Sequence, residues 1–281
     1  TKKDYHLISD LKQIDKWIKD AEQVGEIAVD TETDSLDPHQ ASLIGVSLSS
    51  KIGKACYIPI GHDSKKSLSK DLVLKKLKPI LEDSSIKKIG QNIKFDFIVF
   101  FKHGINMTSM EDTMLMSYVL DAGKNRHNMD TLSEIHLNHK TIAFKDLVGS
   151  GKKEINFRDV DVEKAKDYAA EDADVTYRLY KKFHKSLKQE KLINIYESFE
   201  KPMLKILALM EMEGVKIDNK FLKVLSLKFK KKIEKIQKEV FKISKKEFNI
   251  ASPKQLGEIL YNDLKIADLK RTKKGSFATS A

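Results

Sequence analysis

The sequence predicts an α/β protein, a mixed β-sheet flanked by helices and followed by a smaller unit made only of helices. Short β-type runs gather in the first third of the chain, and helical spacing of apolar residues dominates from Glu111 onward. The length of 281 residues exceeds the ~100 to 200 of a typical single domain. We therefore place a first domain at 1–190 and a helical unit at 191–281.

The predicted sheet begins with a buried strand over 26–30, which ends in acidic side chains. The apolar runs 43–48 and 55–60 follow, separated by a turn around Gly53, and predict an antiparallel meander of three strands. A further short strand is expected at 87–90, leading into a helix. Strands followed by mostly helices indicate a mixed sheet covered by helices.

Helices are predicted over 72–81, from Asn92 onward, and over 162–187, the longest of the first domain. Breaks between helices are expected where polar residues and glycine gather, at residues 121–128, residues 148–153 and Gly214. The helical unit begins near Leu192. It contains a long amphipathic helix whose apolar face consists of Leu222, Leu225, Phe229, Ile236, Val240 and Ile243.

The charge of the chain indicates a polyanionic partner. The net charge is +11 and the pI about 9.3, and clustered lysines replace condensed counterions on a phosphate backbone. Between Lys220 and Glu247 there are 11 Lys against 3 Glu, so most of the excess lies in one stretch. The alternative is a solvated, lysine-rich helix face.

Several classes of protein are excluded by composition. Cys56 is the one cysteine, so no disulfide within the chain and no zinc-finger spacing is possible, which fits a reducing cytosol. No apolar run approaches the ~20 residues that cross a bilayer, and Thr1 to Asp4 begin no secretory signal. We expect a cytoplasmic monomer without a membrane partner. Because Met does not begin the chain and no helix ends it, we expect a piece of a longer protein.

Asp30 and Glu32 stand two apart on the first strand, where side chains at i and i+2 share a face. Two adjacent carboxylates repel each other, and each resists ionisation beside the other. A divalent cation removes that penalty, and hard carboxylate oxygens favour Mg²⁺ or Mn²⁺. The pair therefore suggests a metal site, with a helix-capping or turn role as the common alternative.

Asp172 and Asp96 are two further candidate metal ligands. Tyr168 and Asp172 are four apart in the longest helix and share one face, either as functional groups or as an ordinary side-chain pair. Their neighbours Glu171 and Asp174 point elsewhere and are expected to be solvated or to be helix-start charges. Asp96 follows Asn92, a candidate N-cap, and is favourable near a helix N-terminus on its own.

Taken together in order and spacing, these residues resemble the ribonuclease H-like 3′–5′ exonucleases that use four acidic residues and a tyrosine. The match is closest to the exonuclease region of family A DNA polymerases of the bacterial DNA polymerase I type. It covers nearly the whole chain and is carried by the runs 29–37, 90–96, 126–132, 139–144 and 168–176.

The resemblance implies that Asp30, Glu32 and Asp172 hold one divalent ion, Mg²⁺ or Mn²⁺, and that Asp30 and Asp96 hold a second, partly through water. A pair of ions activates the attacking water and stabilises the leaving 3′ oxygen. With an ordinary pKa of about 10, the Tyr168 hydroxyl is a poor base and is expected to orient that water.

The resemblance further implies a single-stranded or frayed DNA 3′ end as substrate, because a duplex must unpair to reach such a pocket. Six residues match positions that contact the strand: Leu36, Gln91, Asn92, Phe95, Arg126 and Phe144. For Leu36, Phe95 and Phe144, packing in the core is the alternative reading. Arg126 lies in a polar break and is expected to contact phosphate.

Beyond residue 190 the chain resembles the start of a polymerase thumb, with Lys270, Arg271, Lys273 and Lys274 at its expected tip. These lysines and arginine would follow duplex DNA without sequence specificity. Nothing like a polymerase palm follows, so we expect exonuclease activity and no DNA synthesis, as the proofreading part of a polymerase used in replication and repair. The alternatives are a ribonuclease D-like RNA exonuclease and a silent module that only braces DNA.

Overall fold

A computed structural model of the protein describes residues 3–64, 66–151, 154–265 and 277. The chain divides into two compact units, Thr1–Gly214 and Val215–Ala281. Assignment of 1–190 and 191–281 as exonuclease and thumb stays a prediction. The expected thumb tip, Lys270 to Lys274, lies outside the described residues.

Within the described residues, six strands form one mixed sheet in the order β1-β4-β3-β2-β5-β6. The sheet, with helices flanking it, confirms the predicted fold class. The strands are β1 (Asp4–Leu7), β2 (Glu26–Thr33), β3 (Leu43–Lys51), β4 (Lys54–Pro59), β5 (Lys87–Gly90) and β6 (Met110–Asp112). β2, β3 and β4 are the predicted antiparallel meander, and β1, β5 and β6 add parallel pairs.

Two strands and one helix were not predicted from the sequence. β1 has only four residues, and it is a strand because it pairs with β4. β6 has three residues and begins where a helical region was expected from Glu111, because it pairs with β5. Helix α1 (Leu11–Val24) is amphipathic, begins at the N-cap Asp10 and ends at Gly25, whose left-handed φ of 75° suits a residue without a side chain.

The remaining helices of the first unit surround the sheet. They are α2 (Lys70–Glu82), α3 (Ile93–Lys102), α4 (Thr113–Asp121), α5 (Met129–Leu137), α6 (Phe144–Val148), α7 (Val162–Gln189), α8 (Ile193–Ile195) and α9 (Lys201–Glu213), with the 3₁₀ turn η2 (Phe157–Asp159) and the π-helical turn η3 (Tyr196–Glu200). Helix α7, the longest of the first domain, was predicted over 162–187 and is observed over Val162–Gln189. Asn92 lies at the N-cap of α3 as predicted, but its side chain makes no capping hydrogen bond.

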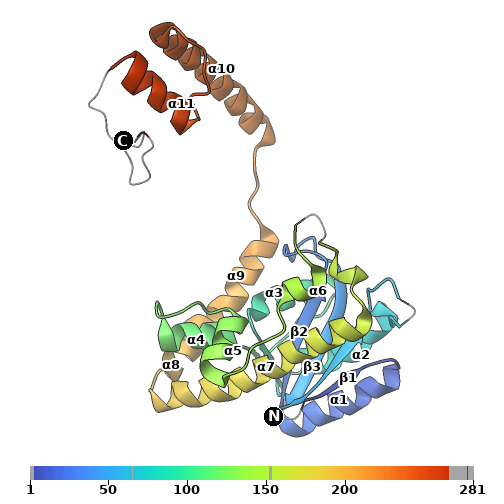
Figure 1. Ribbon diagram of the computed structural model, residues 1–281. Helices are drawn as coiled ribbons and strands as arrows, with labels where there is room; N and C mark the ends of the chain where they lie inside the picture. The colour runs from blue at the N-terminus through green and yellow to red at the C-terminus, as the bar shows by residue number, and fades with distance from the viewer. Residues whose placement is uncertain (1–2, 65, 152–153, 266–276, 278–281) are drawn as a thin grey trace. The chain divides into compact units, whose positions relative to one another are not determined.

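Helices cover both faces of the sheet (Figure 1). α1 and α2 pack on one face, against a core that includes Ile27 and Val29 of β2. α7 crosses the other face and packs against β1 to β4, and Ala28 of β2 belongs to a core cluster on that side. Since side chains alternate along a strand, Asp30 and Glu32 share the parity of Ala28 and face α7.

The second unit contains α10 (Asn219–Ser244), α11 (Pro253–Gly257) and the π-helical turn η4 (Glu258–Asp263). α10 is the predicted amphipathic helix, and Asp218 caps it by accepting hydrogen bonds from the backbone N–H groups of Lys220 and Phe221. Among the described residues, no helix is both long enough and apolar enough to cross a bilayer.

Candidate active site

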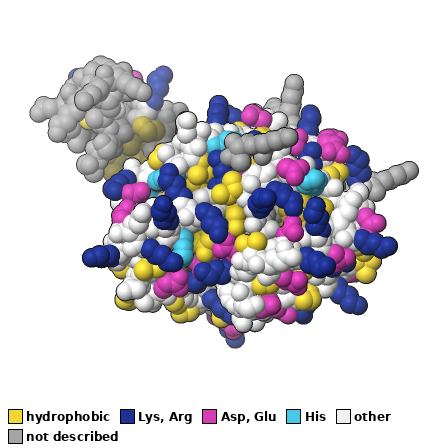
Figure 2. All heavy atoms as spheres, turned by 90° about the horizontal axis from the view of Figure 1, so that it is seen from below, with side chains coloured by type: hydrophobic (Ala, Val, Ile, Leu, Met, Phe, Trp, Pro, Cys, Tyr) yellow, Lys and Arg dark blue, Asp and Glu magenta, His cyan; other side chains and the backbone are white. Residues whose placement is uncertain are grey.

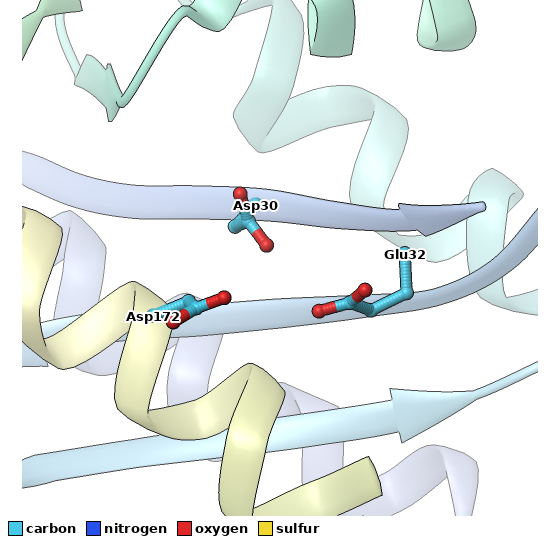
Figure 3. A group of neighbouring side chains, drawn as sticks. All are labelled: Asp30, Glu32 and Asp172. Carbon is cyan, nitrogen blue, oxygen red and sulfur yellow. The ribbon is translucent and has the colours of Figure 1, made fainter. Parts of the chain in front are cut away.

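Three carboxylates converge where β2 meets α7. Asp30 and Glu32 project from one face of β2, and Asp172 projects toward them from α7 (Figure 3). One oxygen from each lies within 4.8 Å of the others. The arrangement follows from strand alternation on one element and helix placement on the other, and it concentrates negative charge at one point.

Asp96, in the first turn of α3, is not one of the three acids within 4.8 Å of one another but lies next to them. Its side chain is buried, and its Oδ1 accepts hydrogen bonds from the Thr31 backbone N–H at 3.0 Å and from the Thr31 hydroxyl at 2.5 Å. Thr31 lies between Asp30 and Glu32 on β2. Burial, followed by the charge of Asp30, raises the pKa of Asp96 well above its usual range, which indicates that these two carboxylates interact.

The cluster is electrostatically unfavourable without a counterion. Burial raises the pKa of Asp30 to about 7. The pKa values of Glu32 and Asp172 are also raised, first by burial and then by neighbouring carboxylates. In the part of the chain that the structure describes, no lysine, arginine or histidine forms an ion pair with Asp30, Glu32, Asp96 or Asp172.

The donor set suits a divalent cation. All the candidate ligands are carboxylates, the ligand type that Mg²⁺ and Mn²⁺ prefer. The Oε1 atom of Glu32 is buried and has no hydrogen-bond partner in the structure, a costly state for a polar atom. A cation between Asp30, Glu32 and Asp172 would give that oxygen a partner and offset the mutual repulsion.

Tyr168 lies one turn before Asp172 on α7. Burial is the main cause that raises the pKa of its hydroxyl far above the ordinary value, and the charges of Asp172, Glu32 and Asp30 add to it. The hydroxyl therefore stays protonated at every physiological pH. It can orient a water molecule through hydrogen bonds but cannot act as a base.

A groove of about 630 Å³ opens over the cluster. Its walls come from the end of β2, the start of α3, the start of α6 and the segment before η2. The lining residues are Asp30, Thr31, Glu32, Thr33, Asp34, Ser35, Leu36, Gln91, Asn92, Phe95, Asp96, Phe144, Glu154, Ile155, Asn156, Phe157 and Tyr168. Five of the six predicted strand-contacting residues therefore line it, and Arg126 is the exception.

The apolar residues of the groove differ in burial. The side chain of Leu36 is 96% exposed and that of Phe144 is 45% exposed, so packing in the core is the wrong reading for both. Phe95 is half-buried and packs against the main core. The Phe144 ring stacks on Phe157 and meets the edge of Tyr168, so the groove has an aromatic wall.

Arg126 lies in the loop between α4 and α5 and is exposed. The loop is nevertheless close to the start of α3, because Gln91 Nε2 donates to the His127 carbonyl at 2.8 Å. The Arg126 guanidinium does not line the groove, and its contact with phosphate remains a prediction.

The groove wall formed by residues 154–157 was not anticipated. Asn156 caps η2 by accepting from the Arg158 backbone N–H, and the Arg158 guanidinium lies 3.4 Å from the Asp34 carboxylate. These contacts hold the segment against the end of β2. The only local signal in the sequence was Asn156, a candidate cap, before the aromatic Phe157. The contact with Asp34 could not be predicted, because Asp34 is more than a hundred positions away in the chain.

Glu171 and Asp174 are neither solvated nor helix-start charges, so that prediction is wrong, because both lie in the interior of α7 and are buried. Their side chains are 0% and 1% exposed. Glu171 accepts hydrogen bonds from Lys3, His139 and the Ile142 backbone N–H. Both residues point away from the cluster, as expected, but α7 is covered on that side too, and each buried carboxylate has tertiary partners.

The face of the molecule in Figure 2 carries lysine and arginine side chains interspersed with acidic ones. This mixture is the usual surface of a soluble domain.

Known proteins that are similar to this chain include nucleases, as the carboxylate cluster suggests. Residues 5–188 match the model of the 3′–5′ exonuclease family, and residues 219–281 match that of DNA polymerase family A. DNA polymerase I of Rhizobium leguminosarum is 40% identical over 99% of this chain, which spans 29% of that protein.

Two solved structures are similar in fold. The POL domain of Pol1 from M. smegmatis, in complex with DNA primer-template and dNTP, has a TM-score of 0.76 and 19% identity, covering 98% of this chain and 43% of that one; this likeness shows the fold alone. Brucella melitensis NrnC with bound Mg²⁺ has a TM-score of 0.54 and 27% identity, covering 70% of this chain and 92% of that one.

The exonuclease match covers more than half of the chain and includes all four clustered acids and Tyr168. A hydrolytic nuclease of this type agrees with a carboxylate cluster beneath an open groove. The chain therefore belongs to the 3′–5′ exonuclease family found in family A DNA polymerases.

Proposed function

We propose that this exonuclease removes nucleotides from single-stranded or frayed DNA 3′ ends as the proofreading part of a bacterial DNA polymerase I, in the cytoplasm with the nucleoid. The observation that carries the proposal is the convergence of Asp30, Glu32 and Asp172, the first two of which line a groove with exposed apolar side chains. A frayed strand is the form of DNA that such a groove can accept, since a paired end presents no free bases.

Asp30, Glu32 and Asp172 would hold one divalent cation, and Asp96 together with Asp30 would hold a second. The bound pair would supply an acidified water and charge stabilisation for the leaving 3′ oxygen. Tyr168 orients the attacking water with its protonated hydroxyl. Leu36, Phe95 and Phe144 hold the terminal bases by apolar contact and stacking, which is tolerant of base identity. Gln91, Asn92 and Arg126 contact bases and phosphates.

The test is degradation of labelled single-stranded DNA, single-stranded RNA and a duplex with a mismatched 3′ end, each with Mg²⁺ and with EDTA. We expect shortening of both DNA substrates from the 3′ end, only with Mg²⁺. Preferential RNA degradation would instead support a ribonuclease D-like enzyme, and binding without shortening would support a bracing module.

Tyr168→Phe should slow hydrolysis about tenfold without abolishing it, since it removes an orienting hydroxyl and leaves the four carboxylates in place. Its KM for single-stranded DNA should not change. Single-turnover rates with Mg²⁺ measure the effect. A loss as large as that of a carboxylate substitution would contradict the orienting role.

Leu36→Ala should weaken single-strand binding about fivefold, because an aliphatic side chain makes apolar contact with a base and contributes less than most of the ~1–3 kcal/mol per base of stacking on an aromatic ring. The free energy of unfolding should not change, because the side chain is almost fully exposed. Fluorescence anisotropy with a labelled oligonucleotide in EDTA measures binding. Leu72→Ala is the matched control, an exposed leucine of α2 outside the groove, and it should bind as the unsubstituted protein does.

A further inference from the structure

A buried polar network links β6 to the turn η3 and to α9. The Tyr196 hydroxyl donates to Glu111 Oε2 at 3.0 Å and accepts from the Asp112 backbone N–H at 2.9 Å. Lys201 Nζ donates to Glu111 Oε1 at 2.6 Å. Tyr196 and Glu111 are fully buried, so each of these groups depends on the others for its hydrogen bonds.

The same stretch of β6 holds the turn that begins α3. The Asp112 carboxylate accepts from the backbone N–H groups of Asn92 at 3.1 Å and Ile93 at 3.0 Å. The Thr113 hydroxyl contacts the Gly90 carbonyl and the Gln91 side chain. Residues 90–93 are therefore attached to 112–113 by side-chain contacts on both sides of the turn.

This turn needs such support. Asn92 has a left-handed φ of 60°, a conformation that costs free energy in a residue with a side chain. A Cβ at Gly90 would lie 2.7 Å from the Ile93 side chain, so strand and helix meet closely there. Since the Asn92 side chain does not cap α3, Asp112 satisfies the free N–H groups at its start.

The turn also positions functional groups. Gln91 and Asn92 line the groove, and Asp96 lies one turn further along α3, where it accepts both hydrogen bonds from Thr31. A shift at the start of α3 would therefore move Asp96 relative to Asp30. Displacements of an ångström in catalytic groups can cost about 100-fold in rate.

We propose that Tyr196 is a positioning residue of the nuclease, which holds β6 through Glu111 and the Asp112 backbone and thereby sets where α3 places Asp96. The proposal rests on the proposed function. It also means that 191–214, beyond the family match that ends at 188, contributes to nuclease geometry although none of its residues lines the groove.

The test compares Tyr196→Phe with Tyr177→Phe in the full chain. Tyr177 is also a buried tyrosine, and its hydroxyl donates to Glu26 at 2.7 Å, at the start of β2 and away from Asp30 and Glu32. Each substitution removes one buried hydroxyl, and Tyr196→Phe should lower the urea midpoint more, because its hydroxyl makes two hydrogen bonds and that of Tyr177 makes one. We expect Tyr196→Phe to reduce kcat on single-stranded DNA about tenfold with KM unchanged, and Tyr177→Phe to keep kcat within about twofold.

A second readout uses no substrate. Titration with Mn²⁺, followed by electron paramagnetic resonance, should show weaker binding in Tyr196→Phe than in Tyr177→Phe, because Asp96 is a proposed ligand. Equal kcat and equal Mn²⁺ binding in the two variants would overturn the positioning role. An unsubstituted chain that neither degrades DNA nor binds Mn²⁺ would instead overturn the proposed function.

Lys201→Met tests the network if Tyr196→Phe does not fold. It removes the cation that pairs with Glu111 and leaves the tyrosine hydroxyl in place. We expect a smaller decrease in kcat with the same unchanged KM. An unaltered kcat and unaltered Mn²⁺ binding would contradict the proposal.

Discussion

Asp172→Asn should abolish hydrolysis of single-stranded DNA and at the same time make the metal-free protein more stable. Asp172 is a proposed ligand of the cation pair, and its loss would remove several kcal/mol of transition-state stabilisation, a decrease of about 10³-fold or more in rate. Binding of single-stranded DNA should remain measurable, because Leu36 and Phe144 keep their exposed positions in the groove.

The stability increase follows from the electrostatics of the cluster. Asp172 is buried beside Asp30, and both pKa values are raised. Neutralising one member relieves repulsion, which we expect to stabilise the metal-free protein by about 1–2 kcal/mol at pH 8. Urea denaturation in EDTA measures it. Mg²⁺ should stabilise the unsubstituted protein by mass action and the variant much less.

The dependence of stability on pH tests separately whether the carboxylate cluster destabilises the metal-free protein. When the pKa of a carboxyl group is higher in the folded than in the unfolded protein, protonation of that group stabilises the fold. This stability is fully present below the unfolded pKa, about 4. It is lost as the pH rises through the folded pKa. For Asp30 the folded pKa is about 7. The metal-free protein should therefore lose stability between about pH 4 and pH 8, with a shallower loss in Asp172→Asn.

Asp174→Asn is the matched control on the same helix. Asp174 is equally buried, but it accepts from the Tyr5 hydroxyl at 2.9 Å and from the Gly53 backbone N–H at 2.6 Å. The substitution should therefore destabilise the protein and leave the hydrolysis rate of the folded fraction unchanged. Stabilisation by Asp174→Asn, or activity in Asp172→Asn, would refute this account of the two acids.

Asp112→Ala should lower the free energy of unfolding by about 4 kcal/mol, because a buried carboxylate that caps two helices is lost. Asp112 accepts from backbone N–H groups of Asn92 and Ile93 at the start of α3 and of Met114 and Leu115 at the start of α4. Burial raises its pKa to about 6, so the experiment belongs at pH 7.5, where the carboxylate is ionised.

Asp10→Ala provides the comparison for Asp112→Ala. Asp10 caps α1 from an exposed position and accepts one hydrogen bond, from the Lys12 backbone N–H at 2.7 Å. Its removal should cost about 1 kcal/mol. Equal losses in the two variants, measured by urea denaturation, would show that the double cap at Asp112 contributes no more than an ordinary surface cap.

Much of the fold could be predicted because its signals are local. The meander of β2, β3 and β4 followed from apolar runs around a glycine turn, and α7 from apolar spacing over its full length. β1 and β6 were missed because strands of four and three residues carry almost no pattern of their own. Their strand conformation comes from pairing with β4 and β5.

The candidate site also has features that the sequence predicted and features that it did not. The order and spacing of Asp30, Glu32, Asp96, Tyr168 and Asp172 were readable from the sequence, because strand and helix periodicity determine which side chains share a face. The groove wall at residues 154–157 and the partners of Glu171 were not readable, because each depends on a residue far away in the chain.

By itself, then, the sequence determined which carboxylates the protein has and on which face of β2 and α7 each one lies. Only the tertiary structure decided that three of them meet within 4.8 Å, that Asp112 caps two helices, and that Tyr196 closes the network behind α3. The physical reason is that periodicity is a property of neighbouring residues, whereas convergence and buried hydrogen bonds depend on how separate elements pack.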